Sequence, residues 1–221
     1  MGAEAERAEA AARALEAAPI ADGGSVREGV IDVIAKVREN VVLRRVATLA
    51  LPGGVVSAYV HNAAAPGLGG VGVLVGLERV PSAGAADGAA PEPLPAASSP
   101  SGAALAELAR RIAMHVAAAR PVFLSRGDVP AVVLERESVI AREAAERSGK
   151  AGAVAEKVIA GRLVKFYSET VLTEQAYIFG QSGERVDKWL LAEAKKAGAP
   201  PVRIAAFAHF IVGDGKGKAE S

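Results

Sequence analysis

The chain has 221 residues, of which 51% are hydrophobic and 23% charged, and its 26 basic and 25 acidic residues give a formal net charge of +1. This balance provides no electrostatic footprint for direct nucleic-acid binding, which requires a clustered basic face. The chain contains no cysteine, so disulfides, thiol catalysis and cysteine-ligated metal sites are excluded. No apolar run approaches the roughly 20 residues of a membrane span, so we expect no membrane insertion.

The first half of the chain is predicted to contain helices followed by strands. Residues 4–18 are rich in Ala, Glu and Arg, which are good helix formers, and residues 26–40 place valines at helical spacing. Three extended segments follow, at residues 41–50, 54–62 and 71–78. The last of these is a continuous apolar run, typical of a strand buried on both faces. We therefore expect an N-terminal subdomain over residues 1–80, built on an antiparallel sheet.

A segment of different composition separates the two halves. Residues 81–102, PSAGAADGAAPEPLPAASSPSG, contain almost no bulky side chain. Such a segment cannot bury enough apolar area to offset the entropy lost on ordering. We predict a flexible insertion here.

Helices dominate the second half. The helix expected at residues 103–119 ends at Arg120-Pro121, because the residue before a proline is disfavoured in a helix. Two further helices over about residues 131–168, joined by the short connection SGKAG, predict a helical hairpin. The remaining expected elements are an amphipathic helix at residues 185–198, a strand at residues 201–215 and a mobile tail at residues 216–221.

Strands followed by helices, with one late strand, indicate an α+β fold. We expect two small subdomains with antiparallel sheets packed by helices. The second subdomain spans residues 103–215 and carries the helical hairpin.

Two patterns suggest chemistry, but neither is specific. The sequence GLGGVG, residues 67–72, fits G-x-G-x-x-G, yet it precedes a strand, whereas the nucleotide-binding version follows a strand and opens a helix. His61, His115 and His209 have no metal-ligand spacing, and no serine occupies a nucleophile elbow. We therefore predict no enzymatic chemistry, no cofactor and no metal site.

The helix at residues 103–119 has an unusual distribution of side chains. Its apolar stripe consists of Leu105, Leu108, Ile112 and Val116. At about 100° per residue, His115 lies roughly 65° from this stripe and Met114 nearly opposite it. Either the helix is buried on two sides, or Met114 and His115 belong to a partner-facing surface. The residues alone leave both interpretations open.

Several segments, in order, resemble the bacterial elongation factor Ts family. LARRIAMHVAAARPVFL resembles the family's I-A-M-H-V-A-A segment followed by proline, and ENVVLRRVATL resembles its E-N-x-x-x-R-R strand. AYVHNAAAPGLGGVGVLVGLE resembles the strand pair Y-x-H and G-x-I-G-V-L-V. GKAGAVAEKVIAGRLVKFYSETVLTEQAYI and FAHFIVGDG resemble two later segments, so the likeness extends over roughly residues 30 to 215.

The resemblance implies a function. Members of the family bind elongation factor Tu and promote exchange of GDP for GTP during protein synthesis, without catalytic side-chain chemistry of their own. Carried over position by position, the resemblance implies that the partner-binding residues are Val71, Gly72, Met114, His115, Val212 and Gly213. We expect the ring of His115 to be partly exposed. Homodimerisation through the helical hairpin is a further expectation.

The sequence departs from the family pattern in one respect. Family members begin with a small helical domain and a Thr-Asp-Phe-Val motif whose Asp-Phe pair is pushed into Tu near its magnesium site, and the 221 residues contain neither. Either the sequence is the core region alone, or it belongs to a shortened paralogue. The alternative function is a module that binds Tu, or another translation partner, without ejecting nucleotide. We expect a cytoplasmic location in a bacterium, or alternatively the mitochondrial matrix after processing.

Overall fold

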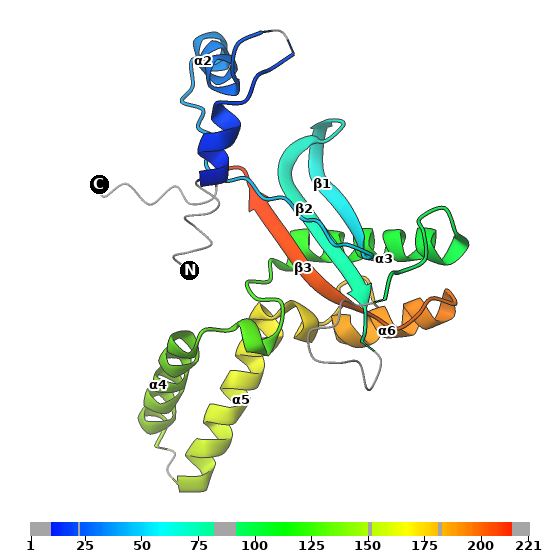
Figure 1. Ribbon diagram of the computed structural model, residues 1–221. Helices are drawn as coiled ribbons and strands as arrows, with labels where there is room; N and C mark the ends of the chain where they lie inside the picture. Colours follow the sequence, from blue (N-terminus) through cyan, green and yellow to red (C-terminus); the bar gives the residue numbers. More distant parts are fainter. Residues whose placement is uncertain (1–9, 22, 82–91, 150–151, 181–182, 214–221) are drawn as a thin grey trace. The chain divides into compact units, whose positions relative to one another are not determined.

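The computed structural model describes residues 10–21, 23–81, 92–149, 152–180 and 183–213 (Figure 1). Contacts within the chain divide it into two compact units, Met1–Thr48 and Leu49–Ser221. The predicted insertion at residues 81–102 lies partly outside the described residues. The division into subdomains on either side of it therefore stays a prediction.

The described part of the first unit contains two helices. Residues 10–16 form one helix, and α2, Val26–Val37, forms another, as its valine spacing predicted. A capping box begins α2: the hydroxyl of Ser25 accepts a hydrogen bond from the backbone N of Glu28 (3.3 Å), and the Glu28 carboxylate accepts one from the backbone N of Ser25 (2.7 Å). The helix ends at Arg38, which adopts a left-handed conformation.

The strand expected at residues 41–50 is not formed. Within the described chain, residues 39–50 have no regular secondary structure, because a β-branched composition does not by itself supply a hydrogen-bonded partner. In the second unit, Leu49 and Leu51 instead lie over Gly76, where an added Cβ would come within 2.4 Å of the Leu51 side chain. These leucines therefore cover the sheet without joining it.

The second unit contains a three-stranded antiparallel sheet. The strands are β1 (Val55–Ala65), β2 (Leu68–Arg79) and β3 (Val202–Ile211), in the order β1-β2-β3. The connection between β1 and β2 includes Gly67, whose φ of 76° is readily adopted only by glycine. The glycines at residues 67–72 thus enter a strand, as expected, and do not open a helix.

The α+β class is confirmed, with one correction to the predicted sheets. The late strand β3 pairs with β2, so a single sheet takes strands from both halves of the chain. Among the described residues, the second sheet expected for the C-terminal half is not formed. The apolar run of β2 explains this difference, because a strand of that composition is stable as a central strand with a neighbour on each edge.

Two helices cover one face of the sheet and form the core with it. α3, Pro100–Ala119, packs on β1 and β2, and α6, Val186–Lys196, packs on β3 and α3 (Figure 1). Leu94 is 8% exposed in the same core, and its backbone N donates to the carbonyl of Gly53 (2.7 Å), so this part of the expected insertion is packed. The core includes Val73, Val75 and Leu77 of β2, Leu105, Ile112 and Val116 of α3, and Val186, Trp189 and Leu190 of α6.

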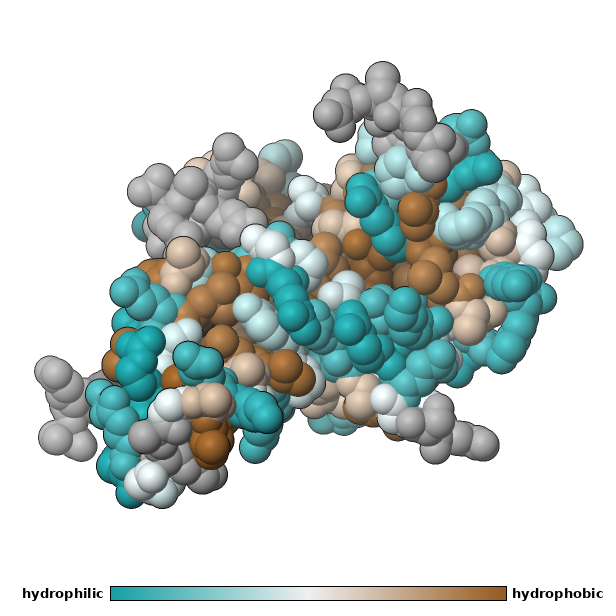
Figure 2. Space-filling model, turned by 90° about the horizontal axis from the view of Figure 1, so that it is seen from below, coloured by the Kyte–Doolittle hydropathy of each residue, from teal (hydrophilic) through white to brown (hydrophobic). Residues whose placement is uncertain are grey.

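The expected helical hairpin is confirmed. α4, Ala131–Arg147, and α5, Gly152–Thr170, pack against each other and project away from the sheet (Figure 1). Apolar surface is visible between polar side chains on the hairpin (Figure 2). The apolar side chains exposed on it are Val132, Val139, Ile140, Val154 and Val164.

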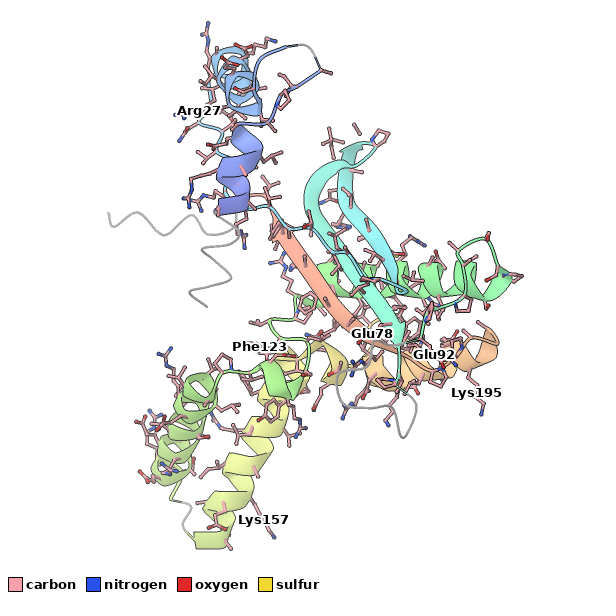
Figure 3. The ribbon with its side chains drawn as sticks, in the orientation of Figure 1. Arg27, Glu78, Glu92, Phe123, Lys157 and Lys195 are labelled. Carbon is pink, nitrogen blue, oxygen red and sulfur yellow. The ribbon has the colours of Figure 1, made fainter. Side chains whose placement is uncertain are left out.

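The root of the hairpin is fixed by backbone and side-chain bonds. Two 3-10 turns flank it, η1 (Arg126–Asp128) and η2 (Leu172–Glu174). The backbone N of Phe123, labelled at this root in Figure 3, donates to the carbonyl of Thr170 (3.0 Å). Arg126 forms a two-pronged ion pair with Glu174, and its guanidinium lies 4.3 Å from the ring centre of Tyr167. These contacts set the direction in which the hairpin leaves the core.

Candidate partner-binding surface

Four of the six residues expected to contact a partner lie together at one end of the sheet. They are Val71 and Gly72 of β2, and Val212 and Gly213 directly after β3. Val71 pairs with Ile211, and the backbone N of Val212 donates to the carbonyl of Gly70 (2.9 Å). The side chain of Val212 is 79% exposed. Residues about 140 positions apart in the sequence are therefore neighbours because β2 and β3 pair.

A groove adjoins this end of the sheet. Val71 is also the cross-strand partner of His61 in β1, and paired side chains face the same side of a sheet. The groove has a volume of about 240 Å³, and its lining is Tyr59 and His61 of β1, Met114, Ala117 and Ala118 of α3, and Phe179. We call it the α3 groove. We call the groove, together with Val71, Gly72, Val212 and Gly213, the sheet-end surface.

Met114 lies in the α3 groove, on a different side of α3 from the core. Its side chain is half-buried, and its sulfur lies 3.5 Å from Nη1 of Arg110. Arg110 in turn forms an ion pair with Glu107 (2.7 Å), and this hydrogen bond lowers the pKa of the Glu107 carboxyl. A polarisable, unbranched side chain beside a groove suits an adaptable contact surface.

His115 does not lie on the surface, and the expectation of a partly exposed ring is wrong. The ring is 0% exposed and lies 5.7 Å from the ring of Tyr177, centre to centre. Its Nε2 is 3.0 Å from Oε1 of Gln175, and its Nδ1 accepts a hydrogen bond from the backbone N of Ile178 (3.3 Å). Burial lowers the pKa of His115, and the bond to Gln175 opposes that shift. Of the two interpretations of α3, burial on a second side is therefore correct for His115.

Gly72 is a glycine that the fold itself does not need. Its φ is not in the left-handed region, and an added Cβ would meet no heavy atom of the described residues within 4 Å. Gly69 differs, because a Cβ there would lie 2.7 Å from the carbonyl O of His61. A glycine that is open to solvent in a strand leaves room for another backbone to approach closely.

Sequence reasoning did not identify three residues of the groove as functional. Tyr59 and His61 lie on the groove side of β1, and the hydroxyl of Tyr59 is 3.0 Å from Nδ1 of His61. Phe179 follows η2 and is 51% exposed. An exposed aromatic side chain next to His61 and Met114 indicates a binding surface. The sequence does not show this neighbourhood, because residues 114 and 179 meet only in the folded chain.

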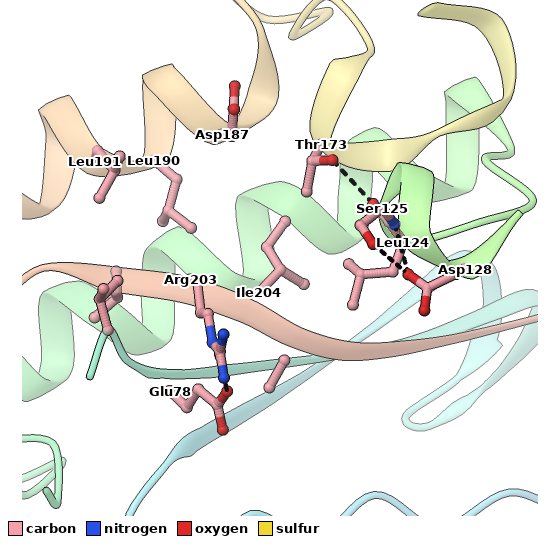
Figure 4. Close-up of a pocket in the computed structure, with 13 residues that line it drawn as sticks. Glu78, Leu124, Ser125, Asp128, Thr173, Asp187, Leu190, Leu191, Arg203 and Ile204 are labelled. Carbon is pink, nitrogen blue, oxygen red and sulfur yellow. Dashed lines mark hydrogen bonds and ion pairs between the residues drawn. The ribbon is translucent and has the colours of Figure 1, made fainter. Parts of the chain in front are cut away.

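A second, larger cavity lies between β3, α6 and η1 (Figure 4). Its volume is about 410 Å³, and leucine, isoleucine and valine side chains form much of its lining. Its polar groups already bond to one another: Ser125 donates to Asp128 through its backbone N (2.8 Å) and hydroxyl (2.7 Å), and Arg203 pairs with Glu78 (2.6 Å). The cavity therefore presents few polar groups in need of a ligand.

Two further observations concern the described residues only. Among them, no three or more His, Asp or Glu side chains come close enough together to hold a metal ion. No helix within the described ranges combines the length and the apolar character needed to cross a membrane.

The sequence matches known proteins over most of its length. The model of the family described as "Elongation factor TS" matches residues 2–214. Elongation factor Ts of Caulobacter vibrioides is 39% identical over 202 residues, which cover 91% of this chain and 58% of that protein. Elongation factor Ts of Rhodospirillum rubrum is 41% identical over 203 residues, or 92% and 59%, and that of Brucella ovis 38% over 200 residues, or 90% and 59%. The chain thus spans less than two thirds of the length of these relatives, and it belongs to the elongation factor Ts family.

Proposed function

We propose that this chain binds elongation factor Tu through the sheet-end surface and promotes exchange of GDP for GTP. Membership of the elongation factor Ts family supports this function. The observation that carries the choice of surface is the gathering of Val71, Gly72, Val212 and Gly213 beside the groove that contains Met114. These four residues were chosen by resemblance to the family, and the pairing of β2 with β3 brings them to one end of the sheet, where a single partner could contact them.

The chemistry of the sheet-end surface suits protein binding. Val212 and Phe179 are well exposed, and Phe179 lines the α3 groove together with Met114. Aromatic and methionine side chains are enriched in protein interfaces, where they act as anchors in small pockets. The open position at Gly72 would let a partner's backbone approach the sheet.

The proposed activity needs no chemical step by this chain. A protein that binds nucleotide-free Tu more tightly than GDP-bound Tu lowers the affinity of Tu for GDP. By linkage, GDP must lower the affinity of Tu for this chain by the same factor. The reciprocal effect distinguishes an exchange factor from a module that binds both states of Tu equally.

The test is a binding measurement in two nucleotide states. The 221-residue chain is immobilised and Tu is added with and without excess GDP. We expect tight capture without GDP and weaker capture with it, together with faster release of a fluorescent GDP analogue from Tu. Equal capture in both states, with unchanged release, would support the alternative of a non-exchanging Tu-binding module. Absence of capture in both states would refute the proposal.

We also propose that two copies of the chain associate through the hairpin. Beside exposed Ile140, α4 and α5 line a hollow of about 310 Å³ with two acidic and two basic side chains, namely Glu137, Glu169, Arg162 and Lys165. A patch that carries both charges around apolar groups can face a second copy of itself in a two-fold interface, with acidic groups opposite basic ones. Light scattering after size-exclusion chromatography tests this: Ile140→Glu should shift a dimer to a monomer, and a wild-type monomer at all concentrations would refute it.

A further inference from the structure

We propose that His115 and Gln175 are positioning residues, which hold Phe179 beside Met114 in the α3 groove; this inference rests on the proposed function. Neither side chain can contact a partner itself, since His115 is 0% and Gln175 4% exposed. Both are nevertheless polar: His115 bonds to Ile178, which precedes Phe179, and Gln175 bonds to His115. Their effect on binding is therefore transmitted through the backbone of residues 176–179.

The first link runs from α3 to Ile178. The backbone N–H of Ile178 can only donate, so the Nδ1 of His115 that receives it (3.3 Å) carries no proton. The proton of the neutral ring is then on Nε2, which donates to Oε1 of Gln175 (3.0 Å). The hydrogen-bond network thus assigns one tautomer and one ring orientation to His115.

The second link ties Gln175 to the ends of two helices. Its Nε2 donates to the carbonyl of Glu169 near the end of α5 (2.8 Å), and more weakly to that of Ala119 at the end of α3 (3.4 Å). With its oxygen and its amino group both engaged, the Gln175 amide has one favourable orientation. A buried network whose members are all bonded specifies geometry more sharply than apolar packing does.

The third link runs from Ile178 to the groove. Phe179 is the next residue, and its ring meets that of Tyr177 edge-on at 5.7 Å. Tyr177 is stacked on Trp189 at 3.8 Å, and the backbone N of Gly180 donates to the carbonyl of Tyr177 (3.0 Å). The half-exposed Phe179 thus stands on a turn that His115 anchors at Ile178. Loss of the anchor would leave Phe179 free to leave the groove.

An alternative explanation is that His115 merely fills the core. An apolar ring would fill the same space without the cost of taking two ring nitrogens out of water. The polar ring therefore costs stability that packing alone does not require. The bond to Ile178 is what a phenylalanine at this position could not make.

The experiment is a double-mutant cycle on Tu binding, run without GDP. His115→Phe and Phe179→Ala should each weaken binding about tenfold, as expected for loss of an interface anchor. The double variant should bind no more weakly than Phe179→Ala alone, because His115 acts through Phe179. His115→Asn can place a side-chain oxygen near the former Nδ1, so it should restore most of the affinity that His115→Phe loses.

The outcomes separate this inference from the proposed function. Losses that add in the double variant, or a Phe179→Ala variant that binds like the wild type, would overturn the positioning role alone. A wild-type chain that does not bind Tu would overturn the proposed function and this inference with it.

Hydrogen exchange of the Ile178 amide gives a readout without Tu: it should accelerate in His115→Phe and stay slow in His115→Asn. Unchanged protection in His115→Phe would overturn the inference. If His115→Phe does not fold, the same cycle and exchange measurement with Gln175→Met take its place, with the same expected and overturning results.

Discussion

The two longest helical regions of the second unit stand in contrast. α3 has eight buried residues, most of them packed on the sheet and α6, whereas among the described residues α5 buries none and α4 only Ala141 and Ala145. Both regions have helical sequence periodicity, so local propensity does not separate them. What differs is the apolar partner: α3 has a sheet, and each hairpin helix has mainly the other. Local stability should follow that difference, with the hairpin opening at lower cost than the core.

The largest expected effect tests this contrast directly. Ile112 of α3 is fully buried in the core, so Ile112→Ala should lower the free energy of unfolding by about 2–5 kcal/mol. Val132 of α4 is 64% exposed and lies outside the hollow proposed for dimerisation, and Val132→Ala should cost about 1 kcal/mol or less. Urea unfolding followed by circular dichroism measures both. Comparable losses for the two variants would contradict the contrast.

A second prediction compares the same substitution at two open glycines. An added Cβ meets no described heavy atom within 4 Å at Gly72 of β2 or at Gly161 of α5. Gly72→Ala should leave the melting temperature unchanged within error but weaken Tu binding by roughly tenfold, because the methyl group blocks close approach of a partner. Gly161→Ala is the matched control and should bind like the wild type. Normal binding by Gly72→Ala would remove this residue from the interface.

A third prediction concerns how the stability of the chain depends on pH through the buried His115 of α3. The pKa of His115 is lowered from its ordinary value of 6.5 by burial, so below that pH the unfolded chain binds more protons than the folded one. Stability should therefore fall as the pH decreases from 6.5 towards the lowered pKa of His115. Below that pKa, His115 is protonated in both states and causes no further loss of stability. Protonation would also place a proton on Nδ1, where Ile178 donates. The wild-type chain should lose stability relative to His115→Asn over this range; parallel curves would contradict the assignment.

The sequence predicted what depends on neighbours along the chain. The spacing of Leu105, Leu108, Ile112 and Val116 predicted the buried side of α3, and Pro121 predicted its end. The hairpin followed from two periodic segments and a short connection. These features succeed because a helix and its ends are specified within a few residues.

The features that the sequence did not predict depend on contacts between distant segments. His115 lies off the apolar stripe, yet it is buried because Gln175 and Ile178 cover it, 60 and 63 residues later. Phe179 has no periodic neighbours that would reveal its place in the groove. The strand expected at residues 41–50 failed for the related reason that composition favours extended backbone but does not supply a partner edge. The sheet-end residues were named by resemblance, and only the pairing of β2 with β3 made them neighbours.

The smallest expected effect sharpens the contrast between α3 and the hairpin. Gly161 is exposed within α5, and alanine is favoured over glycine in a helix interior by up to about 1 kcal/mol. If the hairpin opens separately from the core, Gly161→Ala should slow hydrogen exchange of the α5 amides severalfold while the exchange of α3 amides stays the same. The reason is that a substitution stabilises only the opening reactions in which its own segment unfolds. Equal slowing in α3 and α5, with a rise in the melting temperature of the whole chain, would instead mean that hairpin and core unfold together. The bonds of Phe123 and Arg126 at the root would then couple the two regions more strongly than the burial difference predicts.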